Sequence, residues 1–110
     1  MTPADLKTHR FLAGMARDPY FPRHLVAQGA AILRQLAAEL SANPPADQDA
    51  LFALTHAAVE QFNALQEDFL AEGSELETVA RECIAEDIDT ILRAHGHQVD
   101  LEAAIANRDW

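Results

Sequence analysis

The spacing of apolar residues predicts helices along almost the whole chain. Apolar positions recur at steps of three and four within each segment, and no stretch alternates with a period of two. The clearest segment is residues 54–87, LTHAAVEQFNALQEDFLAEGSELETVARECIAED, interrupted once at Gly73–Ser74. Glycine after an apolar helix and serine before the next are common helix end and start signals. This stretch therefore predicts one long helix that ends in a tight turn and a second helix folded back on it.

The same signals divide the rest of the chain into helices. Prolines stop them at Asp18–Pro19 and Pro44–Pro45, because a residue before proline avoids the helical region. We predict an all-α fold: an irregular antiparallel bundle of four main helices plus a short C-terminal helix, in a single helical domain over residues 1–110. The expected segments run from a Thr2 cap to Arg17, from Pro22 to about Ala42, from Asp47 or Asp49 to Glu72, from a Ser74 cap to His95–Gly96, and from Leu101 to about Asn107.

Two of these helices have unusual apolar patterns. In the first, the apolar residues do not share one face, so the helix should touch two neighbours or pack loosely; they are Leu6, Phe11, Leu12 and Met15. The third has a main apolar face and a second stripe of Phe52, Val59 and Leu70, as expected of a central helix. If the first helix left that stripe uncovered, the protein should dimerise through it. A monomer and a homodimer both remain open.

The charge balance limits the classes of molecule that the protein is expected to bind. Eighteen acidic residues against eight basic ones give a formal net charge of −10. Such a chain repels nucleic-acid phosphates and anionic membranes, and it attracts basic proteins, although charge of this size also simply favours solubility. The single cysteine, Cys83, allows no intrachain disulfide and fits a reducing compartment. With no apolar run near the ~18 residues of a membrane span and no signal-peptide pattern, we expect a cytoplasmic, bacterial-type protein.

One polar line on the third helix is a candidate binding site. His56, Glu60, Asn63 and Glu67 follow at steps of four, three and four, so they share one face. A solvated stripe is the simplest interpretation, and the edge of a ligand groove is the alternative. A metal site is weaker, because carboxylate-bridged bundle sites use a Glu-x-x-His motif on each of two helices, which this chain lacks. We expect no metal and no cofactor.

The loop around Tyr20 and Phe21 is a second candidate, since two rings stand between Pro19 and Pro22. The rings would either clamp helix ends together or form the wall of a ligand pocket, and the clamp is favoured because buried rings usually serve packing.

Asp87 breaks the apolar pattern of the fourth helix, lying within roughly 40° of Cys83 and Ile91 on the helical wheel. A carboxylate there must be paired or hydrogen-bonded, because a buried unpaired charge is very costly. We predict a buried polar tie to another segment rather than a catalytic acid. The candidate partners are Tyr20, the backbone amides of residues 18–21, Arg10, Arg17, His24 and His56. Cys83 itself is expected to be a buried structural thiol.

Several motifs together resemble a known family. They are Tyr20-Phe21-Pro22, LTHAAVEQFNALQEDF, GSELETVARECIAEDI and the terminal RDW. This combination is similar to a small acidic all-helical bacterial family catalogued as a domain of unknown function, over most of the chain after residue 10. The resemblance implies a compact helical protein and carries no activity.

The sequence favours a non-enzymatic function. It contains no phosphate-binding glycine loop, nucleophile elbow or zinc-finger spacing. We predict a small acidic binding or regulatory module, with an immunity- or antitoxin-like role suggested by analogy of charge and fold class alone. The alternative is a small-ligand-binding protein or enzyme that uses His56, Glu60 and Asn63 near the Tyr20–Phe21 loop.

Overall fold

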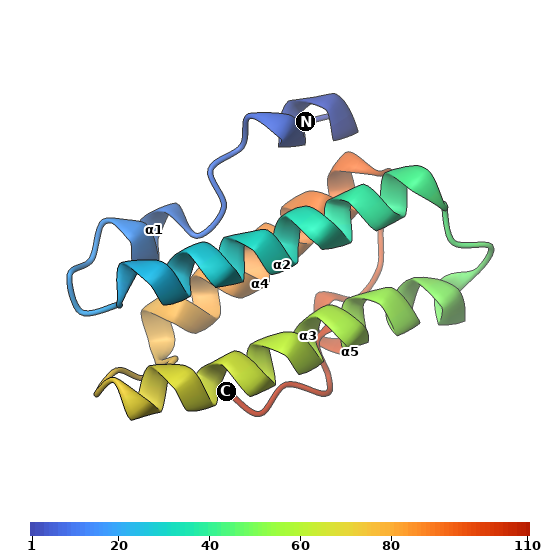
Figure 1. Ribbon diagram of the computed structural model, residues 1–110. Coiled ribbons are helices and arrows are strands. Elements are labelled where there is room, and N and C mark those ends of the chain that lie inside the picture. Colours follow the sequence, from blue (N-terminus) through green and yellow to red (C-terminus); the bar gives the residue numbers. More distant parts are fainter.

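The computed structural model describes residues 1–110, and all of its regular structure is helical, which confirms the predicted all-α class (Figure 1). Three long helices form the body of the molecule, and three short helical pieces cover it. The elements are the 3-10 helix η1 (Pro3–Lys7), α1 (Ala13–Ala16), α2 (Arg23–Ala42), α3 (Gln48–Ala71), α4 (Thr78–Ala94) and α5 (Leu101–Ala104).

The antiparallel pair of α2 and α3 frames the molecule, and α4 packs against α2, α1 and η1 (Figure 1). Asp47 caps α3 by accepting the Ala50 N–H at 2.8 Å. Gly29 is needed where the helices meet: a Cβ at this position would lie 2.8 Å from Leu12 Cδ1 and 3.1 Å from Phe62 Cε1. Twenty-six buried apolar residues, with members from every helix, join in one core cluster.

The N-terminal segment corrects the prediction of one helix from Thr2 to Arg17. It forms η1, an irregular stretch, and the single turn α1, and Leu12 adopts the left-handed conformation with φ of 56°. The reason is the scattered apolar pattern, which no straight helix could bury on one side. With the helix broken, all four side chains reach the core; Leu6, Phe11, Leu12 and Met15 are each at most 5% exposed.

The turn between α3 and α4 also differs in part from the expectation. Gly73 has the predicted left-handed φ of 77°, and the Ser74 N–H bonds to the Phe69 carbonyl at 2.9 Å to close α3. Ser74 does not cap α4, which begins four residues later at Thr78 after Glu77. The intervening segment is pulled inward instead, because it buries Leu76 at 3% exposure.

The ends of the last two helices follow the sequence signals. Gly96 is left-handed after α4, with φ of 80°, and the Asp100 carboxylate accepts the Glu102 N–H at 3.1 Å to begin α5. α5 is shorter than predicted, ending at Ala104 rather than near Asn107. The chain then runs back along α3, and Trp110 is 7% exposed beside the Phe62 ring, with the ring centroids 6.2 Å apart. No helix is both long enough and apolar enough to cross a membrane.

Candidate functional site

The polar line on α3 faces the C-terminal segment, residues 103–109, and holds it in place. His56 Nε2 lies 2.9 Å from the Ala103 carbonyl, to which it donates. Asn63 donates Nδ2–H to the Asn107 carbonyl at 3.0 Å and accepts the Asp109 N–H at 3.1 Å. His56 thus contacts the last turn of α5, and Asn63 satisfies backbone groups of Asn107 and Asp109, which lie beyond the end of that helix.

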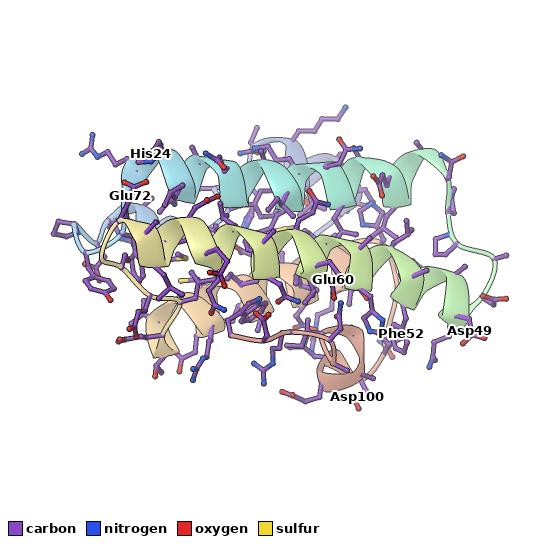
Figure 2. The ribbon with its side chains drawn as sticks, turned by 60° about the horizontal axis from the view of Figure 1, so that its bottom comes forward. His24, Asp49, Phe52, Glu60, Glu72 and Asp100 are labelled. Carbon is purple, nitrogen blue, oxygen red and sulfur yellow. The ribbon has the colours of Figure 1, made fainter.

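The Asn107 side chain in turn donates hydrogen bonds to α3. Its Nδ2 donates to the His56 carbonyl at 2.9 Å and to Glu60 Oε1 at 3.0 Å. Figure 2 shows Glu60 and Phe52 on α3 above the C-terminal segment. The line is therefore neither a fully solvated stripe nor the edge of an open groove over most of its length. Only Glu67, one turn further along, is exposed and takes part in no hydrogen bond or ion pair.

The second apolar stripe is largely covered, though not by the N-terminal helix. Val59 is fully buried, and Phe52 is half-buried and stacked on the His56 ring, with centroids 5.9 Å apart. α5 packs on α3 here. Leu70 alone stays open, at 46% exposure. Dimerisation through the stripe requires that it be uncovered, and of its three residues only Leu70 is.

The Tyr20–Phe21 loop lies far from His56. Phe21 is buried edge-on against Phe69, with ring centroids 6.3 Å apart, whereas Tyr20 is 45% exposed. Phe69 and His56 are separated by about 20 Å along α3, at 1.5 Å per residue. The structure therefore does not bring the loop and the polar line into one pocket, and Phe21 packs as a clamp on the end of α3.

Asp87 meets partners that the sequence did not suggest. Its Oδ2 accepts the Leu12 N–H at 2.6 Å, and its Oδ1 lies 3.2 Å from His9 Nε2. The carboxylate is 14% exposed. It joins α4 to the break between η1 and α1, and it satisfies the backbone N–H of the one non-glycine residue with positive φ, Leu12.

Cys83 lies one turn before Asp87 and is half-buried against α1. A Cβ on Gly14 would come within 2.9 Å of its Sγ. Burial raises the pKa of the Cys83 thiol. The backbone N–H of Met15 opposes this shift, the smaller effects of the negative Asp87 and Glu86 add to it, and the backbone N–H of Gly14 has the smallest, lowering effect. The protonated, unreactive form is therefore favoured.

Sequence reasoning missed several polar contacts that join distant segments. His9 and Asn107 are examples, and a third is the Ser41 hydroxyl, 2.8 Å from His95 Nε2. His95 Nδ1 lies 2.8 Å from the Ile91 carbonyl, to which it donates. The only sequence signal for these contacts is a polar residue near a helix end, and this signal does not predict which distant residue will be the partner.

The clearest exposed feature is the acidic turn, which we define as residues 67–82, the last turn of α3, the connection and the first turn of α4. It carries one basic residue, Arg81, and two of the exposed large apolar side chains, Leu70 and Val79, at 46% and 48% exposure. Its six acidic residues are all exposed: Glu67, Asp68, Glu72, Glu75, Glu77 and Glu82.

The acidic turn has limited internal neutralisation. His24 approaches Glu72, with Nε2 2.6 Å from Oε2, and this pair is labelled at one end of the molecule in Figure 2. No other acidic residue of the turn forms an ion pair. No group of three or more His, Cys, Asp and Glu side chains in the structure is arranged to hold a metal ion. What the turn offers chemically is therefore negative charge beside apolar surface.

Comparison with known proteins places the chain without assigning it an activity. No curated protein and no solved structure matches it. A family model described as "Family of unknown function (DUF5713)" matches residues 5–110, in agreement with the resemblance seen in the sequence motifs. Because this match covers nearly the whole chain, the protein belongs to the DUF5713 family of unknown function.

Proposed function

We propose that the protein is a small, non-enzymatic binding module that takes a basic protein partner at the acidic turn. The observation that carries this proposal is the composition of residues 67–82: six exposed carboxylates, one basic residue and two exposed apolar side chains. Charge of one sign steers a partner of the opposite sign, and exposed apolar residues supply the contact area that charge alone does not.

The position of the turn supports this proposal. It lies at the end of the molecule where α3 ends and α4 begins, beside the loop before α2 (Figure 1). Tyr20 in that loop adds a half-exposed aromatic side chain, linked to the end of α3 through the Phe21–Phe69 contact. Tyrosine is among the side chains enriched in protein interfaces. Neutralisation of a basic protein, as an immunity protein or antitoxin does, would be one form of this function.

The small-ligand or enzyme alternative has less support. The side chains of His56, Glu60 and Asn63 form hydrogen bonds to residues 103–109. The Tyr20–Phe21 loop lies too far away to complete a site with them. None of the four main surface hollows has any of these three residues in its lining.

The test compares two variants that lose the same charge. The turn variant carries Glu75→Gln, Glu77→Gln and Glu82→Gln, three residues in no hydrogen bond or ion pair of their side chains. The control carries Glu39→Gln, Asp49→Asn and Glu102→Gln elsewhere on the surface, where Asp49 and Glu102 are exposed and Glu39 is half-buried. Partners are captured from the native host on the immobilised parent protein, and their affinities for all three proteins are measured by calorimetry at low and high salt.

We expect the captured partner to be a basic protein. Its affinity should fall by about tenfold or more in the turn variant, and also for the parent protein at high salt. In the control variant its affinity should change by less than about threefold. Equal losses in both variants would mean that only net charge matters and would contradict the assignment to the turn. A captured partner without basic character would contradict the proposal as a whole.

A further inference from the structure

A groove of about 550 Å³ lies between η1 and the second half of α2, on a different part of the molecule from the acidic turn. Figure 1 shows the N-terminal turn lying over this part of α2. Leu6 and Phe11 line it from the N-terminal segment, and Ala38 and its neighbours line it from α2. A hollow of this volume is in the range of small-molecule sites.

The hollow exists because α2 presents small side chains here. Ala37, Ala38 and Ala42 all line the groove, whereas the leucines of α2 point to the core. The N-terminal segment is held above them by two anchors. Asp87 bonds the Leu12 N–H, and an Arg34 Nη donates to the His9 carbonyl at 3.0 Å. The space is therefore held open by one contact outside it, Asp87 to Leu12, and by one contact made by Arg34 in its lining.

The charge of the groove is opposite to that of the protein. In a chain with eighteen acidic residues, the only charged groups in the lining are Lys7 and Arg34. Arg34 stands over the Phe11 ring, with its guanidinium carbon 5.2 Å from the ring centroid, and it has N–H groups to spare after bonding His9. Lys7 is exposed and forms no ion pair.

Ser41 also lines the groove, and its hydroxyl lies 2.8 Å from His95 Nε2. Such a pair resembles a nucleophile with its base. Acyl transfer also needs N–H donors for the oxyanion, but Ser41 is in the last turn of α2, where a helix presents carbonyl groups. The geometry therefore fits binding and not turnover.

We propose that this groove binds a small organic anion with an apolar tail, a monocarboxylate of medium chain length. The carboxylate pairs with Lys7 and Arg34, and the tail lies on the exposed side chains of Pro3, Ala38 and Ala42, above the buried Leu6 and Phe11. The argument is complementarity: two cations and no carboxylate line an apolar hollow in a strongly acidic protein. This site is independent of the acidic turn, and neither proposal depends on the other.

Decanoate is a suitable probe, with decylammonium and 1-decanol as matched compounds that change only the head group. Two variants alter the groove: Lys7→Gln removes an unpaired cation, and Ala38→Leu fills the floor. Two controls lie on α2 at exposed positions outside the lining. Arg23→Gln also removes one positive charge, and Ala27→Leu also enlarges an alanine. Titration calorimetry below the micelle-forming concentration gives the affinities, and circular dichroism confirms that each variant is folded.

We expect decanoate to bind the parent protein at one site, at least tenfold more tightly than either matched compound. Lys7→Gln and Ala38→Leu should each weaken binding about tenfold or more, and the controls should stay within about twofold, since electrostatic and packing contacts each contribute on this scale. Equal affinity for decylammonium, no measurable binding, or binding unaffected by Ala38→Leu would overturn the proposal. Self-association of the parent protein that Ala38→Leu abolishes would assign the groove to a second copy of the chain and would also overturn it.

Discussion

At the scale of single residues, a few polar side chains fix the irregular parts of this helical protein. Asp87 is the clearest example, because it accepts the N–H of Leu12 where the backbone is left-handed. A leucine in this conformation costs of order 1 kcal/mol or more. The carboxylate offsets that cost by satisfying the N–H group and by approaching His9. The break in the N-terminal segment thus depends on a residue seventy-five positions away.

Replacement of Asp87 should therefore destabilise the protein. We expect Asp87→Asn to lower the free energy of unfolding by about 1–3 kcal/mol, and Asp87→Ala by at least as much, because the charge-assisted bond to Leu12 is weakened or lost. Urea unfolding followed by circular dichroism measures the change. Asp89→Asn is the control: its exposed pair with Arg93 should be worth less than about 1 kcal/mol. An Asp87→Ala variant as stable as the parent would show that Asp87 is not a tie.

Cys83 should react slowly with alkylating reagents, because burial raises its pKa and keeps the thiol protonated. Iodoacetamide at about pH 8 should modify the native protein at least several-fold more slowly than the urea-unfolded chain, where thiols have the usual pKa of about 8.5. A raised pKa in the folded state also means that stability is unaffected below the unfolded pKa and falls as the pH rises above it. Equal rates in the native and unfolded states would contradict this assignment.

At the scale of elements, the α3 polar line is explained by the chain that crosses it. Residues 105–110 form no long helix, and the backbone groups of Asn107 and Asp109 bond instead to Asn63 and Gln66 on α3. Arg108 and Phe62 enclose the Trp110 ring, with the Arg108 guanidinium carbon 5.7 Å from its centroid. A polar stripe on a central helix can thus bind the protein's own terminus rather than a ligand.

The four positions of the line should accordingly differ in their effect on stability. Asn63→Ala removes a donor and an acceptor to the C-terminal segment and should cost about 1–3 kcal/mol, whereas Glu67→Ala, its neighbour on the same face, should be nearly neutral. Trp110 fluorescence during urea unfolding measures both and should also report loosening of the C-terminal segment in Asn63→Ala. Similar small effects at both positions would mean that the segment is held by apolar packing alone.

At the scale of the whole molecule, charge is unevenly divided along the chain. The first 38 residues contain five of the eight basic residues but only two of the eighteen acidic ones, so the rest of the chain carries nearly all the negative charge. The packing is nevertheless dense, with a radius of gyration of 13.3 Å, close to the roughly 13 Å expected for a chain of this length. Repulsion among the carboxylates of residues 39–110 is therefore a standing cost to the folded state.

Salt should consequently stabilise the protein at neutral pH. Raising NaCl from 0.01 to 0.15 M shortens the screening length from about 30 to 8 Å. We expect Tm to rise by roughly 4 °C, equivalent to about 1 kcal/mol for a domain of this size. Calorimetry at about pH 4, where carboxylates begin to protonate, is the control and should show a smaller rise. A fall in Tm with salt at neutral pH would mean that attractive pairs outweigh the repulsion.

The sequence by itself determined the all-α class, the positions of α2, α3 and α4 to within a few residues, and the left-handed turns at Gly73 and Gly96. These features depend on interactions within a few residues: apolar spacing, prolines, caps and glycines. The sequence also showed that Asp87 needed a partner, since a carboxylate on an apolar face is costly whatever lies opposite.

Only the tertiary structure decided the contacts between distant segments. The break at Leu12, the pairing of Asp87 with His9, and the hold of Asn63 on the C-terminal segment each join residues far apart in the chain. A polar side chain near an apolar face requires some partner, but many partners satisfy the same local pattern. Which one is met depends on how the helices pack, and that packing is set by the shared burial of side chains from all segments.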